Sequence, residues 1–196
     1  MSIRSFIAIK IPPSLGARLA DLPRQAGGLS PSIRWVSAES IHLTLKFLGE
    51  ILPEQIGPIV DQMREAARGI EPLSLSATHV GAFPNEDRPR VIWVGLAEES
   101  GDLSRLQKEI EKRLQKLGFP REEKGFTPHL TLGRARSLPG RKGSLSPVIQ
   151  ALDAAWKGGE DSFTVDRFYL MKSELRPGGA VYSVLEEVLL APEGSP

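Results

Sequence analysis

The sequence predicts an α+β fold with two pseudo-symmetric lobes, each an antiparallel sheet covered by helices on one face, and a central cleft between them. Short alternating apolar segments, typical of strands, are interspersed with longer segments of helical periodicity. The tetrapeptide His-Leu-Thr-Leu occurs twice, at 42–45 and 129–132. Each copy opens the same series of a strand, a helix and two hairpin-like strands, and a unit repeated only twice indicates two lobes rather than a solenoid. We therefore expect residues 1–196 to form a single bilobal domain.

The composition is that of a chain that can bury a core. Apolar residues make up 40% and charged residues 25% of the chain, which excludes wholesale disorder. With 25 Lys and Arg against 24 Asp and Glu, the chain has no overall field that would gather long nucleic acid, so any such contact must be local. The absence of Cys excludes disulfides, iron–sulfur ligation and thiol nucleophiles.

No segment predicts a membrane anchor or an export signal. The apolar run near the start is interrupted by Lys10 and is too short for a signal-peptide core. No stretch approaches the roughly 20 apolar residues of a membrane span. We expect a cytoplasmic protein without a membrane partner, and the near-zero net charge and lack of an obvious exposed apolar helix predict a monomer.

Alternating apolar residues and proline or glycine breaks define the elements of the first half. Leu15, Leu19 and Leu22 form one stripe of a helix, which begins after the strand-ending Pro12, and Gly49 closes the strand of the first motif. The predicted strands are 3–11, 33–36, 41–48, 73–83 and 91–96, and the predicted helices are 14–26 and 53–68.

The second half contains the most clearly predicted helix. Apolar residues recur at helical spacing, Asp102 can cap the start and Gly118 can end it. Ser146 and Pro147 form the cap and first position of a later helix. The predicted helices are 102–117 and 146–157, the strands are 127–133, 163–175 and 181–190, the loop 134–143 is basic, and 191–196 is expected to fray.

The doubled motif is the feature that points to function. The chain has three histidines, and a given histidine is followed by Leu-Thr-Leu by chance about once in a thousand cases at ordinary residue usage. Side chains alternate along a strand, so the histidine and threonine of each motif face one way and the leucines the other. If the leucines pack on the helices, the side chains facing the space between the lobes are His42, Thr44, His129 and Thr131.

Two imidazoles and two hydroxyls suit a phosphate-like anion. An unperturbed imidazole has a pKa of about 6.5, so one ring can be neutral and the other protonated near neutral pH. The neutral ring can take a proton from water while the protonated ring gives one to a departing ribose oxygen, and the hydroxyls can donate to the non-bridging oxygens. Catalytic zinc usually takes three protein ligands, and only His79 is left over, so we expect no metal and no cofactor.

With these residues in view, the chain resembles the two-histidine (2H) phosphoesterases, and among them the RNA 2′,3′-cyclic phosphodiesterases, historically called 2′-5′ RNA ligases. The resemblance runs nearly end to end and includes segments 4–9, 34–36, 42–49, 81–84, 89–93 and 126–134. It implies a bilobal α+β fold that hydrolyses a terminal 2′,3′-cyclic phosphate of RNA to a 2′-phosphomonoester. It also implies His42 as proton donor to the 3′-oxygen and His129 as the base that activates water. Joining of RNA ends through a 2′-5′ linkage would use the same site without ATP.

Arg134 and Lys46 are the candidate cations beside the motifs. The resemblance implies that Arg134 binds the substrate phosphate, but strict alternation places it on the leucine face. It reaches the cleft only if the strand ends or bulges at Gly133. Lys46 shares the face of His42 by alternation, where it either meets a phosphate or is an exposed strand lysine.

Three further features have ordinary structural interpretations. Trp35 could stack on a base, but half-buried packing is the favoured interpretation. His79 stands outside the motif context and is interpreted as structural or on the surface. The basic cluster either guides an RNA backbone or is a solvated loop; its members are Arg134, Arg136, Arg141 and Lys142.

Two other functions remain open at this point. The same cleft could belong to a non-catalytic module that binds RNA ends or nucleotides, or to a phosphodiesterase for another cyclic phosphate or a 2′-5′ oligonucleotide. The presence of both histidines and both threonines favours an enzyme, because binding alone could use Arg or Lys.

Overall fold

The computed structural model describes residues 1–28, 30–136, 144–156, 162–177 and 179–190. The strands within these ranges form one antiparallel sheet in the order β7-β4-β5-β6-β3-β1-β8-β9, and β2 pairs with β6. The strands are β1 (Ile3–Lys10), β2 (Ile33–Trp35), β3 (His42–Ile51), β4 (Leu73–Phe83), β5 (Val91–Ala97), β6 (His129–Ala135), β7 (Ser162–Val165), β8 (Arg167–Arg176) and β9 (Gly179–Leu189).

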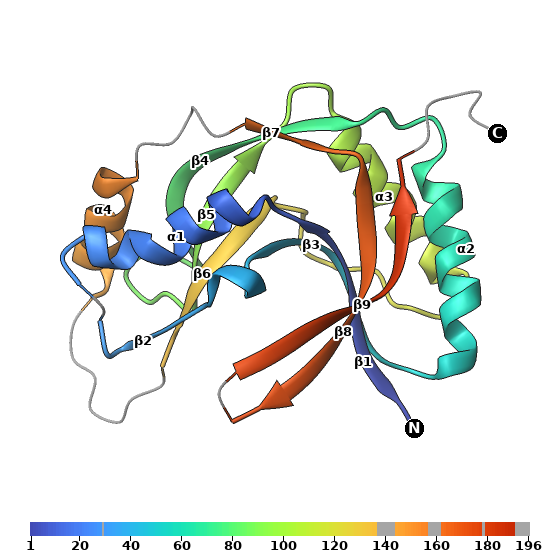
Figure 1. Ribbon diagram of the computed structural model, residues 1–196, viewed down its shortest axis with the longest axis horizontal. Coiled ribbons are helices and arrows are strands. Elements are labelled where there is room, and N and C mark those ends of the chain that lie inside the picture. Colours follow the sequence, from blue (N-terminus) through green and yellow to red (C-terminus); the bar gives the residue numbers. More distant parts are fainter. Residues whose placement is uncertain (29, 137–143, 157–161, 178, 191–196) are drawn as a thin grey trace.

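Helices cover the sheet in two groups. In Figure 1, α1 and α4 lie over the half that contains β4, β5 and β6, and α2 and α3 lie over the other half. The sequence-based prediction of an α+β fold in two helix-covered lobes is confirmed. The helices are α1 (Pro13–Gln25), α2 (Ile56–Ala67), α3 (Asp102–Gln115) and α4 (Ser146–Ala155), with short 3₁₀ turns at Ala38–Ser40 and Pro53–Gln55.

The two lobes meet at the centre of the sheet, where β3 pairs with β6 through Leu43 and Leu130. The series β1-α1-β3-α2-β4 is repeated as β5-α3-β6-α4-β8. Corresponding strands stand equally far from the centre, with β3 and β6 innermost. Strands of both repeats therefore contribute to each lobe. The series of elements predicted after each motif would make 91–96 equivalent to 181–190. This equivalence does not hold, because β5 lies inside the sheet and β9 at its edge.

Element ends differ from prediction where the chain changes partner or lacks a donor. The segment 163–175 is two strands separated at Asp166, because β7 pairs with β4 in one lobe and β8 pairs with β1 in the other. The strand predicted from 127 begins at His129, because Pro128 has no N–H to give to a ladder. Residue 157, the tail 191–196 and most of the predicted basic loop, 137–143, lie outside the described residues.

The core lies between the sheet and its helices, and the motif leucines belong to it. Leu43 and Leu130 are 0% exposed, and Leu45 and Leu132 are buried beside them. Trp93 and Trp156 are also buried, and Trp156 belongs to this core. Across the described part of the chain, no helix combines the length and apolarity needed to cross a membrane. Because the leucines face the helices, the histidines and threonines of both motifs face the opposite side of the sheet.

The central pairing predicts a large loss of stability when it is truncated. Leu130→Ala removes a fully buried side chain at the junction of the lobes, so the free energy of unfolding in urea should fall by about 2–5 kcal/mol. Val181→Ala, at a side chain that is 42% exposed on the edge strand β9, is the control and should change it by less than about 0.5 kcal/mol. Equal losses for the two variants would contradict this view of the junction.

Candidate active site

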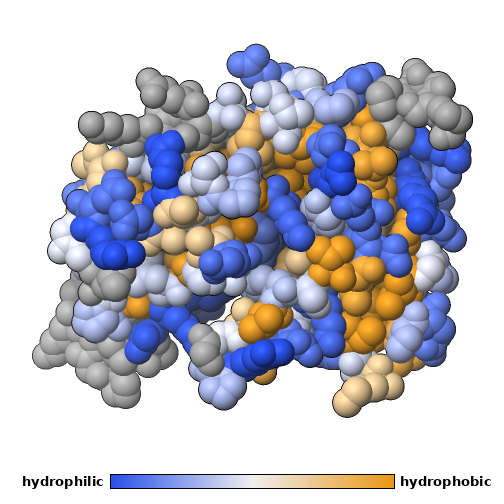
Figure 2. Space-filling view, viewed as in Figure 1, coloured by the Kyte–Doolittle hydropathy of each residue, from blue (hydrophilic) through white to orange (hydrophobic). Residues whose placement is uncertain are grey.

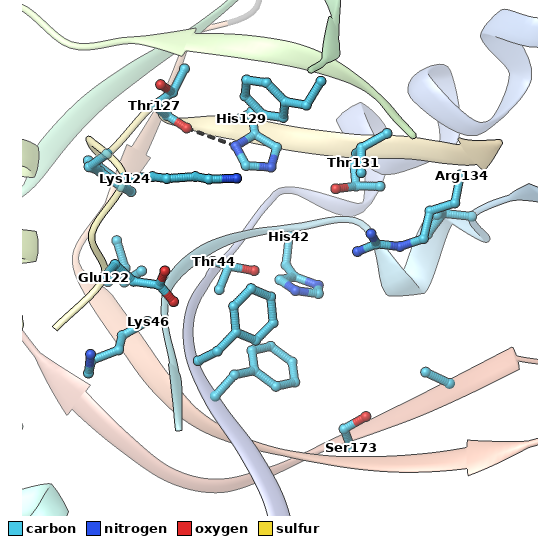
Figure 3. A pocket seen from close by; sticks show the side chains of 18 of the residues that line it. His42, Thr44, Lys46, Glu122, Lys124, Thr127, His129, Thr131, Arg134 and Ser173 are labelled. Carbon is cyan, nitrogen blue, oxygen red and sulfur yellow. Dashed lines mark hydrogen bonds between the residues drawn. The ribbon is translucent and has the colours of Figure 1, made fainter. Parts of the chain in front are cut away.

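One cleft of about 1060 Å³ is lined by His42, Thr44, His129 and Thr131 together. The pairing of Leu43 with Leu130 places the two motifs side by side on antiparallel strands, and Figure 3 shows their side chains around a common cavity. The space-filling surface is hollowed between the α1–α4 lobe and the β8–β9 hairpin, with both hydrophilic and hydrophobic side chains around the hollow (Figure 2). The structure thus brings together the four residues that strand alternation selected.

Both imidazoles are held in the same way. Nδ1 of His42 lies 2.8 Å from the carbonyl oxygen of Ser40, and Nδ1 of His129 lies 2.8 Å from that of Thr127. A carbonyl oxygen only accepts, so Nδ1 carries the donated proton in each ring. Nε2 of the neutral ring is then an unprotonated acceptor, and in Figure 3 Nε2 of His129 faces the cavity. Each ring is therefore arranged to exchange a proton at Nε2.

A β-bulge follows the threonine of each motif. On β3, Thr44 pairs with Ala8 and Lys46 with Ile7, so Leu45 has no partner. On β6, the residues before and after Leu132 pair with two successive residues of β5, so Leu132 has no partner there. A bulge reverses the alternation of side chains beyond it, so the residues after each motif face the opposite way from the sequence-based expectation.

Arg134 was expected to reach the cleft only if its strand ended or bulged, and β6 does contain a bulge. Gly133 pairs with Ile92 while Thr131 pairs with the next residue of β5, so the bulge lies at Leu132, one residue before the expected place. Arg134 consequently lines the cleft and points toward His42 (Figure 3). A Cβ on Gly133 would lie 2.7 Å from a methyl carbon of Ile33 on β2. At this position β2 therefore approaches β6 too closely for any side chain.

The expectation of an exposed Lys46 is wrong, and although the residue borders the cleft its ammonium is engaged in an ion pair rather than free to meet a phosphate. The bulge at Leu45 turns Lys46 to the helix side of the sheet, where it is buried. Its Nζ donates to Glu111 Oε2 at 2.7 Å and to the carbonyl oxygen of Pro120 at 2.7 Å. Simple alternation cannot reveal such a reversal, because the bulge depends on how the neighbouring strand pairs.

Aromatic rings surround the histidines, and sequence reasoning assigned them no place in the site. Phe6 stacks on His42 with centroids 4.8 Å apart, and Tyr182 meets the same ring edge-on at 5.1 Å. Phe83 meets His129 edge-on at 5.0 Å. Alternation along β1 carried a usable signal for Phe6, because its neighbour Ile7 faces the helices. Nothing in the sequence brings Phe83 or Tyr182 to the cleft, since that depends on the sheet order.

The two sides of the cleft differ just beyond the bulges. Phe47 and Arg134 occupy corresponding positions, three residues after the motif threonine on β3 and β6. Phe47 is 59% exposed and lines the cleft, as does Arg134. One wall therefore presents an aromatic face and the other a guanidinium.

Burial and positive charge hold both imidazoles neutral. Burial is the main cause that lowers the pKa of His42 to about 4, and the charges of Arg134 and His129 lower it further against the opposing hydrogen bond to Ser40. Burial and then Arg134 lower the pKa of His129, again against its hydrogen bond to a carbonyl. The expected combination of one neutral and one protonated ring therefore requires an anion in the cleft to restore a proton to one of them.

The remaining candidates within the described ranges lie outside the cleft lining. Trp35 packs against the core on β2, which agrees with its favoured interpretation. His79 is exposed on β4 and meets Trp93 edge-on at 5.4 Å, so it is a surface histidine. Arg141 and Lys142 lie outside the described residues. In the described ranges, no three histidine, aspartate or glutamate side chains gather closely enough to hold a metal ion.

Two facing His-x-Thr motifs on the inner strands of a duplicated antiparallel sheet define the class of two-histidine phosphoesterases. A family model described as LigT like Phosphoesterase matches residues 9–93 and 94–182, and the chain belongs to this family. The two matches begin in β1 and β5, which agrees with the repeat seen in the fold. The prediction of a phosphoesterase is therefore confirmed at the level of the family.

Proteins of similar length are similar to this chain in sequence and in fold. The chain is 36% identical to an RNA 2′,3′-cyclic phosphodiesterase of Archaeoglobus fulgidus, over 93% of this chain and 98% of that protein. It is 31% identical to one of Methanothermobacter thermautotrophicus, over 95% and 98%. A crystal structure from Thermus thermophilus is 28% identical with a TM-score of 0.78, covering 97% of this chain and 100% of that one. E. coli LigT complexed with 3′-AMP, 23% identical with a TM-score of 0.76 over 97% and 99%, shares the fold.

The depressed pKa of His42 predicts a stability that depends on pH. The folded-state pKa of about 4 lies below the unfolded value of about 6.5, so between these values the unfolded chain binds more protons. The free energy of unfolding should therefore fall as the pH falls from 6.5 to 4.

This contribution can be isolated by substitution. Thermal unfolding at several pH values between 7.5 and 4 should show a smaller acid-induced fall in Tm for His42→Asn than for the parent chain. His79→Asn, at an exposed histidine, is the control and should follow the parent. Parallel curves for all three proteins would show that His42 is not held neutral by the fold.

Proposed function

We propose that this protein hydrolyses a terminal 2′,3′-cyclic phosphate of RNA to a 2′-phosphomonoester, with His42 as acid and His129 as base. The observation that carries the proposal is that the two motif imidazoles, both with Nδ1 bound to a carbonyl, share one cleft with two hydroxyls and Arg134. The names of the relatives in Archaeoglobus and Methanothermobacter support the choice of substrate. Both motifs come from one chain, so the site needs no second copy.

The reaction is a displacement at phosphorus. Nε2 of His129 takes a proton from water as the water oxygen bonds to phosphorus. The bond from phosphorus to the 3′-oxygen breaks, and that oxygen keeps the bonding pair and takes a proton from Nε2 of His42. The product carries a 2′-phosphate and a free 3′-hydroxyl. His129 ends protonated and His42 neutral, and exchange with solvent restores the starting state. The same displacement with a 5′-hydroxyl in place of water would form a 2′-5′ linkage.

The environment of each ring supports this division of roles. A bound phosphodiester brings a negative charge that opposes Arg134 and raises the pKa of the adjacent imidazole. Once protonated, a ring with an intrinsically low pKa is a strong acid, which suits His42 as the donor. The hydrogen bond of the His129 ring is exposed whereas that of His42 is part-buried. His129 therefore has the easier access to the attacking water.

The other cleft residues bind the substrate. The hydroxyls of Thr44 and Thr131 donate to the non-bridging oxygens, and Arg134 supplies a positive charge that offsets the charge growing there. Phe47, 59% exposed, lies on the wall opposite Arg134, with its ring centroid 6.2 Å from that of the buried Phe6. Aromatic faces of this kind stack with unpaired bases of single-stranded RNA. The cleft thus combines binding groups for a phosphate and for a base.

Removal of either motif histidine should abolish most of the activity. With EDTA present and a short RNA ending in a 2′,3′-cyclic phosphate, His42→Ala and His129→Ala should each lose at least about 10²-fold in kcat. Product analysis by phosphorus NMR should identify the 2′-monoester.

The control for this assay is His79→Ala, which should keep the parent rate because His79 lies outside the cleft lining. Full activity in either motif variant contradicts the assignment. Binding of the RNA without turnover by the parent chain would instead identify a binding module, and turnover of only other cyclic phosphates would change the substrate.

Arg134 should set the pH dependence. Its charge lowers the pKa of both histidines, so Arg134→Ala should move both limbs of the kcat/KM profile to higher pH while raising KM. Arg136→Ala, an exposed variant outside the cleft lining, should leave the profile in place. A profile that Arg134→Ala does not move would show that its charge does not act on the imidazoles.

A further inference from the structure

The loop between α3 and β6 is fastened beneath the cleft by a buried ion pair. Lys46 and Glu111 are joined at 2.7 Å, with side chains 1% and 6% exposed. Lys46 also donates to the carbonyl oxygen of Pro120, and the N–H of Glu122 donates to Glu111 Oε2 at 3.3 Å. Gln107 donates to the other oxygen of Glu111 at 3.4 Å. The first residues of the loop are therefore held by β3 and α3 at once.

Such a pair contributes position rather than stability. Removing two charges from water costs about as much as their attraction returns, so an apolar pair of similar volume would often serve stability as well. An apolar pair could not form the hydrogen bonds to Pro120 and Glu122. The network holds in place the part of the chain that leads, through Lys124 and Thr127, to His129.

Lys124 projects from this loop into the cleft. It is exposed, it lines the cleft, and it makes no ion pair or hydrogen bond with any described residue. Figure 3 shows its side chain extended toward the cavity on the far side of the histidines from Arg134. The cleft therefore has a cation on each side of the histidine pair, Arg134 and Lys124, in addition to Arg4 and Arg90 in the same lining. The reacting phosphate is assigned only to Arg134.

The size of the cleft leaves room for a second phosphate. Its volume of about 1060 Å³ lies just above the roughly 300–1,000 Å³ typical of sites for one drug-sized ligand. We propose that Lys124 forms a second anion subsite that binds the phosphodiester on the 5′ side of the terminal nucleotide. The proposal rests on the proposed function and specifies the substrate as an RNA strand rather than a nucleoside cyclic phosphate.

Glu122 limits where that phosphodiester lies. Its side chain also faces the cleft from the same loop, between Lys124 and Lys46 in Figure 3. A carboxylate repels a phosphate, so the phosphodiester sits on the Lys124 side, away from Glu122. Neutralising Glu122 and removing the charge of Lys124 should therefore change RNA binding in opposite directions.

The test compares two substrates that share the reacting cyclic phosphate and differ in the nucleotides, with their phosphodiesters, on its 5′ side. For a tetranucleotide ending in a 2′,3′-cyclic phosphate, Lys124→Ala should lower kcat/KM about tenfold through KM, as expected for loss of about 1.4 kcal/mol of binding. Its kcat/KM for a nucleoside 2′,3′-cyclic phosphate should not change. Glu122→Gln should raise kcat/KM for the tetranucleotide only. Lys116→Ala, an exposed variant at the end of α3 outside the cleft lining, is the matched control and should change neither.

Equal loss on both substrates would overturn the proposal, because Lys124 would then act on the reacting phosphate. An unchanged kcat/KM for the tetranucleotide would overturn it as well.

A binding measurement separates this proposal from the hydrolysis itself. A single-stranded oligonucleotide with 2′-deoxy sugars and a 3′-phosphate cannot react, and its affinity should fall with salt. Lys124→Ala should reduce the slope of log K against log salt by about 0.7, the value for one phosphate contact of a single strand. If the slope falls but the parent chain hydrolyses neither substrate, the subsite stands and the proposed function fails. An unchanged slope overturns the subsite even if hydrolysis is observed.

A double variant tests the anchoring role of the buried pair. Lys46→Met combined with Glu111→Leu replaces the pair by apolar side chains that the core can accept. It should lower kcat/KM for the tetranucleotide more than for the nucleoside cyclic phosphate, with thermal unfolding confirming that the chain is folded. A folded double variant that retains the parent preference for the longer substrate would contradict the anchor. The test on Lys124 does not depend on this variant.

Discussion

The pairing of β3 with β6 is the interaction on which the site depends. Leu43 and Leu130 are fully buried where these strands meet, and burial of the leucines turns the alternate side chains to the opposite face. The helical layer therefore determines where His42 and His129 point, although no helix residue needs to touch them. Because the two strands come from different repeats, the site exists only when both repeats are folded together.

Two matching bulges turn this symmetric frame into an asymmetric site. Each strand contains one extra residue just after the motif threonine, so the next outward positions are taken by Phe47 on one side and Arg134 on the other. The same irregularity buries Lys46, which then fastens the loop that precedes His129. A small departure from regular pairing thus places a cation, an aromatic face and a loop anchor around a duplicated motif. The burial of the rings, and after it the charge of Arg134, lowers the pKa of both imidazoles and holds them neutral until an anion arrives.

Much of this arrangement could be predicted from sequence, and the rest has identifiable physical causes. Strand periodicity and the repeated motif predicted the fold class and the face on which His42 and His129 lie. Alternation failed for Lys46 because a bulge depends on the partner strand, and it located Arg134 only conditionally. The break at Asp166 was missed because both flanking segments are apolar and only their partners differ. Lys124 was missed because a loop residue has no periodicity to indicate its direction.

The central claim is that the two imidazoles act on one phosphate, and nitrogen NMR of the histidine rings tests it most directly. Titration with a nucleoside 2′-monophosphate should shift the Nε2 resonances of His42 and His129 together, with one dissociation constant, while Nδ1 of both rings remains protonated. At least one ring should gain a proton at Nε2 on binding. A response confined to one ring, or two responses with different affinities, would contradict the claim that both rings face the same anion.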